Sequence, residues 1–169
     1  LNDQFISKID DIANLRRGRL TIGSSPFRST YLLSQIIPLF EQKFPGVDLI
    51  LKEDTTRQLE ELALNGQTDL SISLLPIDIK RFDYEELFRE ELLLALPPNH
   101  PLSVKLHRQP GDYHNPPQIK LQDIQETPFI LMDQGQKLHR TLFHLCHNAG
   151  FTPRILLETQ SMNAAQALV

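Results

Sequence analysis

The sequence predicts an α/β fold built on parallel sheets, and three observations lead to this class. Short apolar segments with the period of strands alternate along the chain with longer segments of helical period. Serine, threonine, glycine and proline stand where one segment gives way to the next. The 169 residues, 40% of them hydrophobic, suffice for one mid-sized domain or two small lobes. Strand–helix–strand order implies parallel strands with helices on the faces of the sheet.

The chain begins with a predicted short helix and a strand. Residues 5–15 carry apolar side chains at near-helical spacing, and Gly18 ends this pattern. Residues 19–23 alternate apolar with small or polar side chains, which predicts the first strand. Two serines and Pro26 follow, and these residue types start helices.

The next elements continue the alternation. Apolar residues at helical spacing predict a helix over 31–44, in which Pro38 should produce a kink or a division. Residues 47–51 predict a second strand. A third strand over 70–75 follows a helix that starts at Thr55 or Thr56 and closes at Gly66.

The middle of the chain contains the predicted boundary between two lobes. Residues 87–96 are rich in leucine and predict a strand. Three prolines in residues 97–101 stiffen the connection that follows, and we place the boundary there. The polar residues 103–117 predict a long surface loop.

The second lobe repeats the alternation of strands and helices. Strands are predicted over 129–132 and 155–157, with a helix over 139–149 between them and Gly150 at its end. A last helix begins at 163.

Composition excludes several classes of protein. The net charge of −4 and pI of about 5.8 argue against a nucleic-acid surface in this segment, which would need clustered Lys and Arg. No apolar run approaches the ~20 residues of a membrane span. Cys146 is the only cysteine, so no internal disulfide can form and a reducing cytoplasm is expected. The start has neither a signal-peptide pattern nor a methionine, and we expect the chain to be an excised piece.

Several motifs occur in an order that resembles LysR-type transcriptional regulators, and together they cover nearly the whole chain. The segment 15–23 is similar to that family's entry from a linker helix into the first sensor strand. The further matching motifs are Phe40 to Val47, Leu59 to Leu70, Pro97 to Leu102, Pro128 to Ile130 with Arg140, and Ala149 to Pro153.

The resemblance implies two Rossmann-like lobes of the periplasmic-binding-protein type, with a cleft that holds a small-molecule effector. It implies the end of a linker helix in residues 1–18, a first lobe in 19–96, and a hinge crossover with the second lobe in 97–169. Three features depart from the family pattern: the late position of Pro38, the length of the 103–117 loop, and an early end that leaves the second lobe incomplete.

Candidate effector-binding residues of the first lobe follow predicted strands. Ligands of open α/β sheets bind beyond the carboxyl ends of the strands, where helix N-termini attract anions. After the first and third strands, the candidates are Ser24, Ser25, Phe27, Arg28, Leu74 and Pro76. The alternative is that Ser25 only caps a helix, Arg28 is solvated and Leu74 is core; the resemblance favours the binding interpretation.

The second lobe offers a matching segment between a predicted strand and helix. Its candidates are Asp133, Gln134 and Gln136. These residues equally suit an ordinary polar turn. In the family resembled, this region faces the first-lobe segment across the cleft.

No motif predicts catalysis, a cofactor or a metal. His139, His144 and His147 share a predicted helix, yet no cysteine or carboxylate completes a ligand motif. Cys146 falls on the apolar stripe of that helix and is expected in the core. Nucleophile elbows and phosphate-binding glycine loops are missing from the sequence.

The resulting hypothesis is the sensor domain of a cytoplasmic, homodimeric DNA-binding regulator rather than an enzyme. A small, anionic effector would change the pose of the lobes, and a winged helix-turn-helix outside this sequence would bind DNA. The alternatives are a periplasmic-type solute-binding protein of a transporter, which would need an export signal, and an enzyme on the same lobes.

Overall fold

The computed structural model describes residues 18–106 and 116–169. The expected first helix lies outside the described residues, as does most of the expected 103–117 loop. The chain divides into two compact units, Leu1–Phe82 and Asp83–Val169, and each is described by itself. The sequence places the lobe boundary further along, after Leu96, and that assignment stays a prediction.

A three-stranded parallel sheet forms the first unit, with strand order β2-β1-β3. The strands are β1 (Gly18–Ser24), β2 (Val47–Glu53) and β3 (Leu70–Ser71). β1 lies in the centre and pairs with both neighbours. The parallel arrangement predicted from the order of elements is confirmed, although β3 is shorter than the predicted 70–75.

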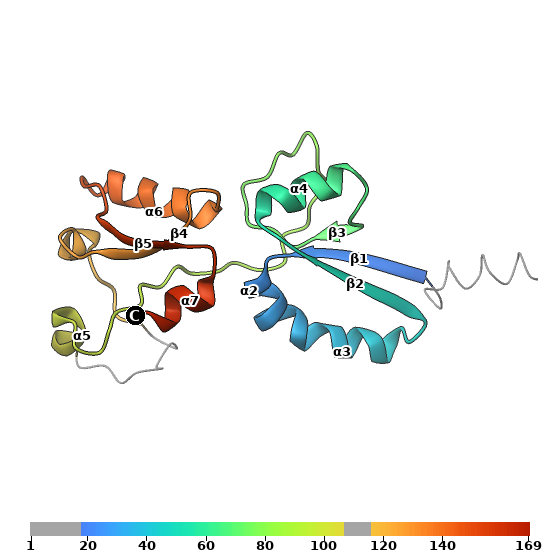
Figure 1. The fold of residues 1–169 in the computed structure, drawn as a ribbon, viewed down its shortest axis with the longest axis horizontal. Coiled ribbons are helices and arrows are strands. Elements are labelled where there is room, and N and C mark those ends of the chain that lie inside the picture. Colours follow the sequence, from blue (N-terminus) through green and yellow to red (C-terminus); the bar gives the residue numbers. More distant parts are fainter. Residues whose placement is uncertain (1–17, 107–115) are drawn as a thin grey trace, which may run out of the picture. The chain divides into compact units, whose positions relative to one another are not determined.

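Helices cover both faces of this sheet. One path consists of α2 (Pro26–Arg28), the π-helical turn η1 (Ser29–Leu33) and α3 (Ser34–Lys43), and α4 (Thr56–Leu64) lies on the opposite face (Figure 1). Pro38 lies inside α3, which continues through it. Because proline has no N–H, Pro38 cannot donate the usual helical hydrogen bond to the carbonyl oxygen of Ser34. The widened turn η1 ends directly before Ser34.

Close approach at the centre of the sheet explains the choice of glycine at position 23. A Cβ there would lie 2.5 Å from Ser71 Oγ and 3.1 Å from Leu59 Cδ2. Leu59 is 1% exposed, and α4 packs against β1 at this position. The missing side chain of Gly23 therefore lets α4 and β3 pack tightly against β1.

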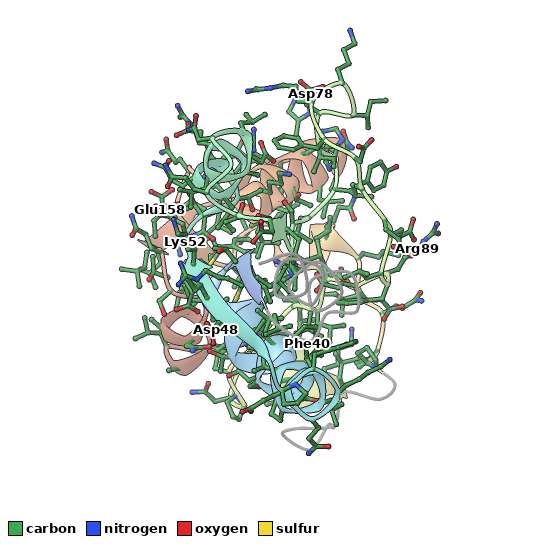
Figure 2. All side chains as sticks on the ribbon, turned by 90° about the vertical axis from the view of Figure 1, so that its right-hand side faces the viewer. Phe40, Asp48, Lys52, Asp78, Arg89 and Glu158 are labelled. Carbon is green, nitrogen blue, oxygen red and sulfur yellow. The ribbon has the colours of Figure 1, made fainter. Side chains whose placement is uncertain are left out.

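The predicted strand over 87–96 is wrong. Neither sheet of the described residues includes this segment, and it adopts no helix. Leu87, Phe88 and Leu92 are each more than half exposed, and Figure 2 shows Arg89 directed outward. A strand needs a neighbour to complete its backbone hydrogen bonds, and no described strand supplies one here.

A two-stranded parallel sheet, β4-β5, forms the second unit. Its elements are α5 (Pro101–Leu106), the 3-10 turn η2 (Leu121–Ile124), β4 (Phe129–Met132), α6 (Lys137–Asn148), β5 (Ile155–Thr159) and α7 (Met162–Ala167). Both α6 and α7 contact β4, on opposite sides of it (Figure 1). The two strands and both helices after them confirm the predicted order.

The expected loop over 103–117 needs a correction at its start, where α5 is helical as far as Leu106. His100 precedes this helix, and its Nδ1 accepts a hydrogen bond from the Leu102 N–H at 3.2 Å. Its Nε2 lies 3.5 Å from Thr127 Oγ1. The imidazole caps the helix in the way that a short polar side chain does, and this contact stabilises the start of α5.

The core of the second unit contains Cys146. Its side chain is fully buried, together with Ile124, Leu131 and Met132, so its predicted place in the core is confirmed. Burial raises the pKa of the Cys146 thiol above its ordinary value. In the part of the chain that the structure describes, no helix is long and apolar enough to cross a membrane.

Candidate functional site

Ser24 ends the central strand of the first unit. Its side chain is fully buried, and its hydroxyl donates to the Ser25 carbonyl oxygen at 3.3 Å. The Ser24 carbonyl oxygen accepts a hydrogen bond from the Asp54 N–H, just beyond the end of β2. These contacts fix the course of the chain at the strand end, from which the next residues project.

Ser25 caps the helical path that follows β1. Its backbone is extended, and its Oγ accepts a hydrogen bond from the Arg28 N–H at 3.4 Å. Ser25 therefore caps this helical path, whichever further role it has. The side chain is half-buried, so the cap leaves part of Ser25 accessible from the strand end.

Phe27 and Arg28 occupy the first turn after the strand, and both are half-buried. The Phe27 ring packs on the ring of Tyr31, with centroids 4.7 Å apart. This contact stabilises the turn that carries Arg28. Arg28 adds a permanent positive charge beside the end of β1.

The segment after β3 begins next to the end of β1. Ile72 N–H donates to the Gly23 carbonyl oxygen at 2.8 Å, which places the following residues near the first strand's exit. Leu74 is half-buried and Pro76 is exposed. The topology therefore brings the two predicted first-unit segments to the same edge of the sheet, as expected for neighbouring parallel strands.

Two further serines were not singled out from the sequence. The hydroxyls of Ser29 and Ser73 are buried and have no hydrogen-bond partner within the described protein. Ser29 lies in η1 after β1, and Ser73 lies two residues after β3. Buried hydroxyls are normally paired, so Ser29 and Ser73 are exceptions among the described residues.

Asp133 occupies the corresponding place in the second unit, directly after β4. Its N–H donates to the Thr159 carbonyl oxygen at 3.0 Å, which joins the ends of β4 and β5. Its Oδ1 is buried and has no hydrogen-bond partner within the described protein. With Ser29 and Ser73, this makes three such atoms among the described residues, and all follow the carboxyl ends of parallel strands.

The two glutamines of this segment differ in their surroundings. Gln136 is half-buried, and its Nε2 donates to the Gln160 carbonyl oxygen at 3.2 Å. Gln136 thereby ties the start of α6 to the end of β5. Gln134 is exposed. The structure thus brings Asp133 and Gln136 together at the strand ends, and it leaves Gln134 facing solvent.

The histidines of α6 have contacts of their own. His139 Nε2 lies 3.2 Å from Glu158 Oε1, and His144 Nε2 lies 3.1 Å from Asn148 Nδ2. Within residues 18–106 and 116–169, no group of three His, Cys, Asp or Glu side chains is arranged to hold a metal ion. The polar groups at the strand ends are suited to hydrogen bonding and charge pairing with a ligand.

Comparison with known proteins gives a consistent result. Residues 13–169 match the family model of the LysR substrate binding domain. The uncharacterized HTH-type transcriptional regulator YcgK of Bacillus subtilis is 27% identical over 187 aligned positions, which cover 98% of this chain and 58% of that protein. The chain therefore spans little more than half the length of this curated relative.

Solved effector-binding domains share the fold. The effector-binding domain of QuiR in complex with shikimate superposes with a TM-score of 0.76 at 17% identity, covering 90% of this chain and 69% of that one. The BenM effector-binding domain with its effector benzoate gives a TM-score of 0.71 at 22% identity, covering 90% of this chain and 65% of that one. Since the family model matches nearly the whole sequence, the chain belongs to the LysR substrate-binding domain family.

Proposed function

We propose that this chain is the effector-sensing domain of a LysR-type transcriptional regulator and that it binds a small anionic molecule at the strand-end segments. The residues proposed to contact the effector are Ser24, Ser25, Phe27, Arg28, Leu74, Pro76, Asp133, Gln134 and Gln136. Ser29 and Ser73 join them because their hydroxyls are buried and unpartnered.

One observation carries this proposal. All three unpartnered buried polar atoms of the described residues follow strand ends, where the ligands of open α/β sheets bind. Leaving such an atom without a partner costs about 1–3 kcal/mol. A ligand that binds only the folded protein at these strand ends stabilises it, so binding and stability are coupled.

The charge of the ligand follows from the first unit. Arg28 lies in the turn after β1, and α2 has no acidic residue in its first turn. In the two related structures named above, the bound molecules benzoate and shikimate are both carboxylates. A carboxylate effector suits the guanidinium of Arg28, which can pair with both carboxylate oxygens.

The remaining activities belong to the whole protein, of which this chain is the sensing part. DNA binding would come from a winged helix-turn-helix outside this sequence, and the intact regulator would act in the cytoplasm as a homodimer. The family match favours this function over that of a transporter's solute-binding protein, which was the alternative on the same fold. As a regulator, the protein would respond to its effector by a change of conformation, without catalysis.

The intact regulator provides the test. Purified protein should protect a promoter near its own gene in a footprinting experiment, and a carboxylate effector should change the pattern of protection. The acidic 169-residue chain alone should give no sequence-specific shift of duplex DNA at physiological salt. Absence of promoter protection by the intact protein would contradict the regulatory function.

Assembly needs a separate measurement. Tyr31, Ile36 and Leu39, on and before α3, are each more than 40% exposed and form apolar surface suited to an interface. Light scattering should give a dimeric mass for the intact sensor domain. A monomeric mass at high micromolar concentration would contradict the dimer.

A further inference from the structure

His100 holds the start of α5 through a ring nitrogen that carries no proton. Its Nδ1 accepts a hydrogen bond from the Leu102 N–H at 3.2 Å. A backbone N–H only donates, so Nδ1 must present a lone pair. The proton of the neutral ring is then on Nε2, which lies 3.5 Å from Thr127 Oγ1 and donates toward it. The two contacts therefore fix the Nε2–H tautomer of this histidine.

The chemistry of this cap differs from that of the other capped helices. Ser25, Thr55 and Ser161 cap α2, α4 and α7 through hydroxyls, which do not change their charge near neutral pH. Imidazole is the side chain that ordinarily takes up a proton between about pH 8 and pH 5. Of these four helices, α5 is therefore the one whose cap depends on pH.

Protonation of His100 removes the cap for two reasons. The added proton occupies the Nδ1 lone pair, so the ring can no longer accept from the Leu102 N–H. The new positive charge also lies at the positive end of the helix dipole, where a cation is unfavourable. The Nε2–H remains a donor, so the ring keeps its contact with Thr127 while the start of α5 loses its acceptor.

The described surroundings of the ring offer little to offset this charge. Its two contacts, with Leu102 on α5 and Thr127 before β4, are both with uncharged groups. The ionisable side chains closest in sequence to these contacts are Lys105 and Glu126, and both are exposed. Within residues 18–106 and 116–169, the ion pairs do not include His100.

We propose that His100 is a pH-sensitive switch, whose neutral ring holds the start of α5 and whose protonated ring releases it. The folded protein gains this proton only by giving up the cap, whereas the unfolded chain gains it without that loss. The stability of the second unit, in which α5 is the first helix, therefore falls as pH falls from about 8 to about 5. The switch operates in the ligand-free protein and does not depend on effector binding.

Urea unfolding of the intact, ligand-free regulator at about pH 8 and about pH 5.5 tests this switch. His100→Asn is the informative variant, because an amide oxygen caps a helix without taking up a proton in this range. Its midpoint for the sensor-domain transition should match that of the wild type at the higher pH and exceed it at the lower pH. The corresponding gain in the folding equilibrium constant should be about two-fold to thirty-fold, which is the value of one helix cap.

Two further variants separate the cap from other effects of histidine. His100→Ala should lie below the wild type at about pH 8 and equal it at about pH 5.5, since the wild type has then lost its cap as well. His147→Asn removes an exposed histidine from α6 and should show at least the wild-type fall of the midpoint. An equal change of midpoint with pH in the wild type and His100→Asn would overturn the proposal.

Nitrogen-15 NMR of the imidazole rings in the intact regulator gives a second test, which needs no variant to fold. At about pH 8, the His100 ring should show an unprotonated Nδ1 and a protonated Nε2. The opposite tautomer, with the proton on Nδ1, would mean that this nitrogen cannot accept from Leu102, and the switch would then be excluded.

Discussion

His139 on α6 lies against Glu158 on β5, with 3.2 Å between Nε2 and Oε1, and the contact fastens the first turns of the helix to the strand. The imidazole also stacks on the Phe143 ring, with centroids 4.5 Å apart. Only 12% of the His139 side chain is exposed. Because α6 starts at the proposed effector-binding segment, this pair positions Asp133 and Gln136 indirectly.

A double-mutant cycle should measure this pair. Glu158→Ala and His139→Ala should each lower the free energy of unfolding, and the coupling between them should be about 0.5–1.5 kcal/mol. The exposed Arg57–Glu61 pair on α4, 3.4 Å apart, is the comparison. Its coupling should be about 0.3–0.5 kcal/mol. Equal coupling in the two pairs would contradict a special role for the His139 contact.

Cys146 should make stability depend on pH in the alkaline range. Burial raises the pKa of its thiol in the folded protein above the ordinary value for cysteine. Below that value the thiol is protonated in both states. Above it the unfolded chain loses the proton first, so stability falls as pH rises. Denaturant unfolding between pH 8 and 10.5 should show this fall, and Cys146→Ala should reduce it. An identical pH dependence in the variant would contradict this assignment.

Gly23→Ala should destabilise the first unit. The added Cβ would lie 2.5 Å from Ser71 Oγ and 3.1 Å from Leu59 Cδ2, and overpacking of this kind costs about 1–3 kcal/mol. Ser71→Gly in the same chain should recover part of the loss. Gly18→Ala, on the same strand with nothing within 4 Å of its Cβ, is the matched control. Thermal melts would measure all three, and a neutral Gly23→Ala would show that the sheet is looser than described.

Ser25→Ala and Arg28→Ala should separate binding from folding in the intact regulator. Loss of the Ser25 cap should cost about 0.5–2 kcal/mol of stability, and thermal melts of both variants separate this loss from any change in binding. Both variants should weaken the transcriptional response to the effector, measured with a promoter–reporter fusion. Thr55→Ala removes a similar cap from α4 and is the control. An unaltered response in both variants would remove these residues from the site.

Local chemistry made much of the fold predictable from the sequence. Ser25 and Thr55 cap helices, Gly66 and Gly150 have positive φ at helix ends, and Cys146 is in the core, as their neighbours in the sequence indicate. These features depend on contacts within a few residues or on helical period.

The wrong predictions concern segments whose structure depends on residues that are distant in the sequence. Residues 87–96 have the composition of a strand, yet strand formation requires a partner that composition cannot reveal. The helical start of the 103–117 segment depends on the cap from His100, which a polar loop pattern hides. The sequence does not predict that the hydroxyls of Ser29 and Ser73 lack partners, because this depends on the residues that surround them in the fold.

Hydrogen exchange of the intact regulator, with and without a bound carboxylate effector, is the decisive test of effector binding at the strand ends. Exchange protection reports which backbone segments a ligand stabilises. Added protection should concentrate in peptides containing residues 24–29, 72–76 and 133–137. Protection confined to other segments, such as the C-terminal turns of α3 or α6, would contradict effector binding at the strand ends.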